Sequence, residues 1–121
     1  MEGLSLYLES VDPERNRLRW YELIAFPLPG DRFHLIRRWG RIGRSSSSGR
    51  DDKLPSWDVC KRTVRRVLCL RARHGYEPTM PEAVQLSLWQ ASPNRLLHLL
   101  PDESSPWHSC LPNVWLGERA L

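Results

Sequence analysis

Hydrophobic and polar positions alternate along the first part of the chain, which is the period of a β-strand with one buried face. Leu4, Leu6 and Leu8 alternate in this way, and the sequence DPE at residues 12–14 interrupts the pattern. A second strand is predicted over residues 17–26, RLRWYELIAF, because aromatic and β-branched residues favour strands. The turn sequence PLPGD follows it, so the pattern predicts two strands separated by short breaks.

A third strand is predicted directly after this turn, over residues 32–42. Successive side chains of a strand point to opposite faces, so its odd and even positions form two separate rows. The odd row consists of Phe33, Leu35, Arg37, Trp39 and Arg41, and the even row of His34, Ile36, Arg38, Gly40 and Ile42. We therefore expect the Trp39 and Arg41 side chains to share one face of the sheet.

The hydrophobic spacing changes from two residues to three and four after a polar segment. Residues 45–53, SSSSGRDDK, have no apolar period and predict a mobile loop. From Trp57 onward the apolar residues have the spacing of an amphipathic helix, and they are Cys60, Val64, Val67 and Leu68. Ser56 suits the N-cap and Gly75 the left-handed C-terminal cap. The outer face of this helix carries Lys61, Arg62, Arg65 and Arg66.

The C-terminal segment, residues 77–121, differs in composition, since it holds six of the ten prolines and three of the six tryptophans. This is too apolar for a disordered tail. Short helices are predicted after Thr79, which opens a capping box, and after Ser92. We expect an α+β fold in which one amphipathic helix packs across a compact antiparallel sheet of four to five strands. Residues 1–76 would form this domain, and residues 77–121 a Pro- and Trp-rich extension of short elements packed on it.

Charge separates the same two segments. Residues 1–76 contain 16 Lys and Arg against 9 Asp and Glu, a balance of +7, whereas residues 77–121 contain 2 against 5, a balance of −3. Between residues 32 and 73 the count is 13 basic to 3 acidic, and most of the basic residues are arginine. Basic side chains on a helix are often only a solvated face. Together with the basic strand end, however, they indicate a surface that binds a phosphate backbone.

Several classes of protein are excluded by what the sequence lacks. The 121 residues contain no apolar run near the ~20 residues of a membrane span, and the start MEGLSLYLES lacks a basic signal region. We therefore expect a cytoplasmic protein with no membrane contact.

The cysteines and acidic residues predict neither a metal site nor an enzyme active site. Three cysteines cannot all be joined in disulfides within one chain, which fits a reducing compartment, and those in the helical pattern are expected to be buried. His108 and Cys110 form half a zinc site without a second half, so neither metal nor cofactor is expected. Without a Gly-rich phosphate loop, paired carboxylates or a nucleophile beside a base, we expect a protein that is not an enzyme.

The stretch RRWGRIGR, residues 37–44, carries a resemblance to a known family. With the upstream triplet Arg19-Trp20-Tyr21, the following helix and the closing pair Gly75-Tyr76, residues 4–76 resemble the WGR domain. That family includes the DNA-break-sensing module of poly(ADP-ribose) polymerases and many small bacterial proteins, and the chain looks like a stand-alone bacterial member.

This resemblance implies roles for two residues. In the family the motif tryptophan packs against the sugar of a terminal nucleotide at a DNA break, a role that falls on Trp39. The motif arginine belongs to the same working surface, and this role falls on Arg41. Two positions depart from the family pattern. Leu18 stands where relatives often have asparagine, with Asn16 two places earlier, and Arg44 with four serines replaces a Gly-Gln pair.

The sequence therefore predicts a non-catalytic module that binds duplex DNA at breaks, nicks or ends without sequence specificity. The candidate nucleic-acid-binding residues are Trp39, Arg41, Arg37, Arg38, Arg44, Arg19, Lys61, Arg62, Arg65 and Arg66. Two alternatives stay open. In the first, Trp39 is a core residue that the arginines merely cover. In the second, the chain is an adaptor that binds another protein, through either the Trp39 and Arg41 face or residues 77–121.

Overall fold

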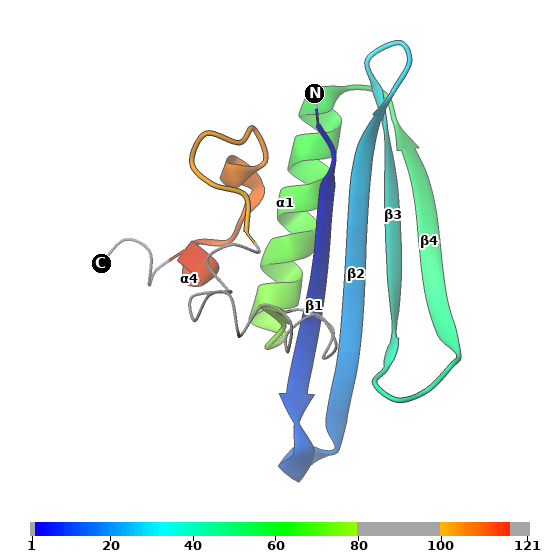
Figure 1. Ribbon diagram of the computed structural model, residues 1–121, viewed down its shortest axis with the longest axis vertical. Helices are drawn as coiled ribbons and strands as arrows, with labels where there is room; N and C mark the ends of the chain where they lie inside the picture. Colours follow the sequence, from blue (N-terminus) through cyan, green and yellow to red (C-terminus); the bar gives the residue numbers. More distant parts are fainter. Residues whose placement is uncertain (1, 80–99, 117–121) are drawn as a thin grey trace, which may run out of the picture.

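A computed structural model describes residues 2–79 and 100–116 of the chain. Five antiparallel strands form one sheet in the order β4-β3-β2-β1-β5, and one long helix packs across one of its faces (Figure 1). The elements are β1 (Leu4–Asp12), η1 (Pro13–Arg15), β2 (Arg17–Leu28), β3 (Arg32–Arg41), β4 (Ser47–Leu54), α1 (Trp57–Arg73), β5 (Glu77–Pro78), η2 (His108–Cys110) and α4 (Asn113–Leu116). The predicted α+β fold class is confirmed.

The breaks in the alternating pattern form the turns of this sheet. The segment at residues 12–14 leads into η1, and Asn16 closes that turn in a left-handed conformation with a φ of 55°. At the next turn Gly30 and Asp31 both have positive φ, at 83° and 59°. Glycine takes such a conformation without steric cost, and aspartate tolerates it better than most residues. The strands flanking both turns are therefore placed as neighbours, as predicted.

Strand β4 corrects the prediction of a mobile loop over residues 45–53. Its residues pair with β3 from Ser47 opposite Gly40 to Leu54 opposite Phe33. Main-chain hydrogen bonds hold such a strand, and these do not depend on apolar side chains. Because β4 lies at the edge of the sheet and most of its side chains are exposed, hydrophobic periodicity was not needed to form it. Polar and charged residues are typical of protected edge strands.

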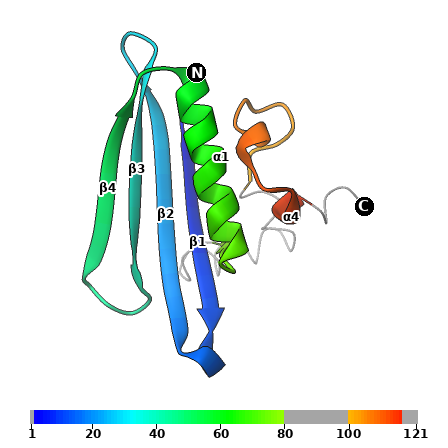
Figure 2. The same cartoon turned by 180° about the vertical axis from the view of Figure 1, so that it is seen from behind.

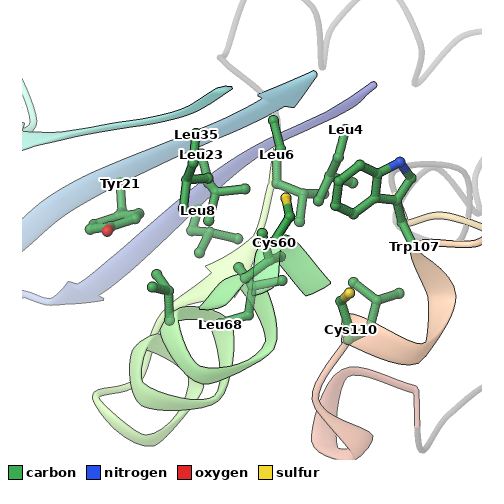
Figure 3. Close-up of a cluster of buried hydrophobic side chains, with 14 of the residues drawn as sticks. Leu4, Leu6, Leu8, Tyr21, Leu23, Leu35, Cys60, Leu68, Trp107 and Cys110 are labelled. Atoms are coloured by element: carbon green, nitrogen blue, oxygen red, sulfur yellow. The ribbon is translucent and has the colours of Figure 1, made fainter. Parts of the chain in front are cut away.

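The hydrophobic core fills the space between α1 and one face of the sheet (Figure 3). The alternating leucines of the strands meet the apolar stripe of the helix, as their two periods predict. The fully buried leucines and the helix residues packed on them include Leu8, Leu23, Leu35, Cys60, Val64 and Leu68. Each large apolar side chain buried in this way contributes about 1.5–3 kcal/mol, so this layer holds α1 in place.

Helix α1 begins and ends where the sequence predicts. The backbone N–H of Val59 donates to the side chain of Ser56 at 3.2 Å, which caps the first turn. At the other end, Gly75 has a φ of 84°. A Cβ at that position would lie only 3.2 Å from Nη2 of Arg17, so glycine also lets β2 approach the end of the helix.

The C-terminal residues 100–116 pack against α1 (Figure 2). Trp107 is 1% exposed, and its ring meets Trp57 edge-on at 4.7 Å between centroids. The Trp107 indole N–H donates to the carbonyl of Glu2 at 3.0 Å, and the Trp115 indole N–H donates to the carbonyl of Tyr76 at 3.2 Å. These contacts make the described part of the segment an extension of the core.

Strand β5 follows directly after residue 76. Residues 77 and 78 pair with Glu9 and Leu8 of β1, so two residues of the predicted extension belong to the sheet, and the predicted division of the chain stays a prediction. A two-residue strand is too short to show a period, which is why its sequence gave no signal. The helices predicted after Thr79 and Ser92 lie outside the described residues.

Candidate functional site

Trp39 and Arg41 share the face of the sheet on which α1 packs, as predicted. In the register of β2 and β3, Tyr21 lies opposite Trp39, and Arg19 lies opposite Arg41. Phe33 and Leu35 point from the same face of β3 but belong to the buried core. The site is therefore the continuation of the core face.

The Trp39 ring packs against the hydrophobic core. It stacks on that of Tyr21, with 5.8 Å between centroids and 8° between the planes, and Tyr21 is itself only 3% exposed. Trp39 is half-buried and lines an open hollow. It therefore packs on the core with part of its surface and leaves the rest accessible. Stacking of this kind fixes the plane of the indole.

An arginine that the sequence did not single out completes this aromatic cluster. The guanidinium carbon of Arg71 lies 5.1 Å from the ring centroid of Tyr21 and 5.5 Å from that of Tyr76. Tyr76 is buried and meets Tyr21 edge-on. The signal was present, because Arg71 follows Val67 and Leu68 by four and three residues and so lies on the apolar stripe of α1. A cation on that stripe indicates a local polar site.

Together these residues form an open hollow of about 510 Å³, called here the basic hollow. Its wall contains the aromatic residues Tyr21, Trp39 and Tyr76. Its cationic residues are Arg19, Arg37, Arg41 and Arg71. No carboxylate lies among its lining residues, within the part of the chain that the structure describes. A concave surface with four guanidinium groups attracts anions.

Arg41 is held in a fixed direction by the turn that precedes β2. Its Nη2 donates to Oδ1 of Asn16 at 2.8 Å, and its Nη1 donates to the carbonyl oxygen of Asn16 at 3.3 Å. Asn16 itself has a left-handed backbone conformation, with a φ of 55°. Asn16, which stands two places before the family's usual asparagine position, therefore orients the motif arginine. This link between distant positions had no signal in the sequence.

Two arginines of the hollow have donors that no protein group accepts. Nε of Arg37 and Nε of Arg71 are buried and have no hydrogen-bond acceptor among the described residues. The other end of Arg37 is paired, because its Nη2 lies 3.4 Å from Oδ2 of Asp52. A buried donor without an acceptor costs about 1–3 kcal/mol, and an oxyanion that accepts from such a donor offsets part of that cost.

Arg38 and Arg44 lie away from the basic hollow. Arg38 belongs to the opposite row of β3 and lines a depression on the other face with Trp20. Gly40 lies against the Trp20 ring, where a Cβ would lie 3.0 Å from Nε1, so a larger residue there would press on Trp20. Arg44 is exposed in the turn after β3, where its backbone N–H donates to the carbonyl of Arg41 at 3.2 Å.

The four basic residues of the outer helix face do not line the basic hollow. Lys61 lies over the Trp57 ring, 5.7 Å from its centroid. Arg65 donates to the carbonyls of Ser109 and Leu111 at 2.8 and 3.3 Å, so its head group holds the C-terminal segment. Arg62 and Arg66 are exposed. Since a helix rises 1.5 Å per residue, Lys61 is about 15 Å from Arg71 along the axis of α1.

The buried thiols have no catalytic features. Cys60 and Cys110 are fully buried, while Cys69 is half-buried because it lies at the border of the apolar stripe, which corrects its expected burial. Burial raises the pKa of Cys60 to about 11, with a smaller contribution from the nearby Cys110. Burial likewise raises the pKa of Cys110. A protonated thiol is a poor nucleophile and a poor metal ligand.

Residues 2–79 and 100–116 are the part of the chain that the structure describes. They contain no group of three or more His, Cys, Asp or Glu residues placed to hold a metal ion. In the same ranges, no helix has both the length and the apolar character needed to cross a bilayer.

Fold and site together define a small α+β domain whose surface carries an arginine-rich hollow with an aromatic wall. The family model of the WGR domain matches residues 4–83, about two thirds of the chain, and the match includes β5. The chain belongs to the WGR domain family. No curated protein and no solved structure gives a significant match.

Proposed function

We propose that this protein is a non-catalytic DNA-binding module that recognises breaks, nicks or ends of duplex DNA without sequence specificity. One observation carries the proposal, namely the basic hollow, in which an accessible tryptophan lies among four arginines and no carboxylate lines the wall. Membership of the WGR domain family is consistent with nucleic-acid binding. The proposal has a stacking part and an electrostatic part.

The stacking part rests on Trp39. Its indole is backed by Tyr21, so its exposed surface is a rigid platform for a sugar or a base. Stacking of a base on an aromatic side chain contributes about 1–3 kcal/mol in single-strand binders. In a continuous duplex the bases are stacked on one another, whereas a break or an end leaves a terminal nucleotide accessible. A preference for ends follows from this accessibility.

The electrostatic part rests on the arginines. A guanidinium group binds phosphate with two parallel hydrogen bonds, and the bonds to Asn16 hold Arg41 in advance. The buried Nε–H groups of Arg37 and Arg71 are two further donors that have no acceptor among the described residues. Contacts of this kind position a nucleic-acid backbone but carry no sequence information. Contacts between arginine and phosphate therefore support binding that is independent of sequence.

The lining of the basic hollow also supports binding rather than reaction. It offers guanidinium groups, aromatic rings and one glycine, but no carboxylate, imidazole or thiol within the described part of the chain. Arginine remains protonated and does not act as a general base at neutral pH. The proposed function is therefore binding without a chemical reaction.

An adaptor function has one observation in its favour. Val114 of α4 is 73% exposed, beside the half-buried Trp115 and Leu116. An isolated exposed apolar side chain is ordinary on a soluble protein. DNA binding therefore remains the proposed function, and a protein partner that docks on residues 100–116 is the second candidate.

A salt titration tests the electrostatic part. Binding of fluorescent nicked, blunt-ended and covalently closed circular DNA is measured at 50 and 200 mM salt, the range over which counterion release is large. With three to four phosphate contacts, log K for duplex DNA should fall with log salt at a slope of roughly −3 to −4. A slope near zero contradicts DNA binding.

A substitution tests the stacking part in the same assay. Trp39→Ala should weaken binding to nicked and blunt DNA far more than binding to the closed circle. The matched control combines Arg62→Gln with Arg66→Gln, which removes two exposed charges outside the basic hollow and should preserve the preference for ends. If Trp39→Ala instead unfolds the domain, Trp39 is a core residue and the stacking role fails.

A further inference from the structure

A second hollow adjoins the basic hollow, and the proposed function does not use it. This adjacent hollow has a volume of about 500 Å³ and lies between the start of β2 and the end of α1. It shares Arg19, Arg71 and Tyr76 with the basic hollow. It adds Arg15, Arg17, Arg73 and His74. The two hollows therefore share part of their lining, and together they are called here the depression.

The adjacent hollow carries a large excess of positive charge. Five arginines line it, and the carboxylate of Asp12 pairs with two of them, at 3.5 Å from Nε of Arg15 and 3.9 Å from Nη2 of Arg17. The C-terminal end of α1 adds about half a negative charge. Neither that partial charge nor one carboxylate balances five guanidinium groups, so the hollow favours a polyanion over a single counterion.

Unpaired donors provide a second and independent observation. Nε of Arg17 is buried and has no hydrogen-bond acceptor among the described residues, and the same is true of Nε of the shared Arg71. Arg17 is also close to the chain at Gly75, so its position is restricted. Such donors are normally satisfied, and an oxyanion is the natural partner of a guanidinium N–H.

The two parts of the depression differ in their aromatic surface. The basic hollow offers Trp39, whereas the aromatic residue of the adjacent hollow is Tyr76, which is buried and already meets Tyr21 edge-on. The adjacent hollow therefore suits phosphates rather than stacked bases. From Arg19 to Arg17 the strand advances two residues, about 7 Å, which is comparable to the spacing of successive phosphates on a nucleic-acid strand.

We propose that the adjacent hollow binds the phosphates of a single-stranded extension that continues beyond the duplex end held at Trp39. This inference rests on the proposed function and specifies its substrate, namely a DNA end with an overhang rather than a blunt end. The arginines there bind the extension through its backbone, so the preference should not depend on the sequence of the overhang.

The test compares two DNA hairpins that differ only in a short overhang. Affinity is measured by fluorescence anisotropy across a salt series, with 5′ and 3′ overhangs tested separately. At least one overhang should bind tighter than the blunt hairpin. Its salt slope should also be steeper by about 1.4, which corresponds to two added single-strand contacts at about 0.7 each.

Two variants locate the effect. Arg17→Gln should abolish the overhang advantage, but this residue also pairs with Asp12 and packs near Gly75, so its melting temperature must be measured as well. The combined change Arg15→Gln and Arg73→Gln should disturb the fold less, because both side chains are exposed and the pair of Arg15 with Asp12 is a surface ion pair of small energetic weight. It should reduce the overhang advantage while binding of the blunt hairpin stays close to that of the wild type. The control, Arg62→Gln with Arg66→Gln, should preserve the advantage.

The possible failures are distinguishable. Equal affinity of the wild-type protein for blunt and overhang hairpins overturns the inference and leaves the proposed function standing. An equal loss on both hairpins in the Arg15 and Arg73 variant also overturns it, because the adjacent hollow then binds duplex. Absence of binding to any hairpin overturns the proposed function, and the inference with it.

Discussion

The sheet face on which α1 packs has two halves of opposite chemistry, although the same alternating sequence pattern runs through both. Along the odd row of β3, Phe33 and Leu35 are buried beneath α1, whereas Trp39 and Arg41 line the basic hollow. The same division runs along β2, where Leu23 is buried and Arg19 is exposed. The period of two determines which face a residue occupies, but the helix packed on that face determines whether the position is core or site.

Arg37 marks the border between the halves. Its side chain is 17% exposed, and its head group reaches Asp52, which also accepts a hydrogen bond from Nε of Arg50 at 2.9 Å. This arrangement ties the edge strand β4 to the site. The apolar half thus supplies rigidity and the basic half supplies donors, so substitutions in the two halves should affect different properties of the protein.

The largest expected effect lies in the apolar half, at Trp107. Trp107→Ala removes a fully buried indole that packs on Trp57 and Phe33 and should cost about 3–5 kcal/mol of unfolding free energy. Urea denaturation measures the loss. Val114→Ala, in the same segment but exposed, should stay within about 0.5 kcal/mol of the wild type. Similar effects of the two changes would show that residues 100–116 are not part of the core.

A slightly smaller effect is expected at Leu35, in the same row as the site. Leu35→Ala leaves a cavity under α1 and should cost about 2–5 kcal/mol, measured in the same way. Trp39→Ala, four residues further along this row, should cost less because the indole is only half-buried. The reverse order would mean that the core extends into the basic half.

Substitution of Arg41, in the basic half, should affect binding and not stability. Arg41→Gln removes hydrogen bonds of a charged donor worth about 1.5–3 kcal/mol, and so should weaken blunt DNA binding about 10- to 100-fold. Its unfolding free energy should change by no more than about 0.5 kcal/mol, since its bonds to Asn16 are exposed. Arg41→Lys should recover the affinity only in part, because lysine lacks the planar fork. Full recovery would argue against bidentate phosphate binding.

The smallest expected effect concerns the thiols of the apolar half. A thiol reagent at pH 8 should modify Cys69 first and reach Cys60 and Cys110 only as the protein unfolds. Because folding raises the pKa of Cys60 from 9.0 to about 11, its contribution to stability is complete below pH 9 and is lost as the pH rises toward 11. Rapid modification of all three thiols in the folded protein would contradict this burial.

Sequence patterns predicted the parts of the fold that depend on hydrophobic period. The alternating leucines of β1 and the spacing of Cys60, Val64 and Leu68 specified a sheet face and a helix face that must meet. Strand β4 was not predicted, because main-chain hydrogen bonds at the edge of the sheet hold it and these leave no hydrophobic pattern. Strand β5 was not predicted because two residues have no period.

The candidate site was predictable only where it coincides with a motif. Trp39 and Arg41 follow from the RRWGRIGR stretch and its alternation. Arg71, 32 residues after Trp39, was signalled only as a cation on the apolar stripe of α1. Its place beside the motif depends on tertiary structure, as does that of Asn16 in the turn before β2. The basic residues on the outer face of α1 looked equivalent in the sequence. In the structure, however, Arg65 bonds to the C-terminal segment, whereas Arg66 is simply exposed.

The central claim is that the basic half of the face binds nucleic acid while the apolar half does not take part. Nuclear magnetic resonance of ¹⁵N-labelled protein titrated with a blunt DNA hairpin tests it directly. The indole N–H signal of Trp39 and the Nε–H signals of Arg37 and Arg71 should shift on binding. The indole signal of Trp107, buried in the apolar half, should not. Unchanged Trp39 and arginine signals at saturating DNA, or shifts confined to Trp20 and Arg38 on the opposite face, would contradict the account.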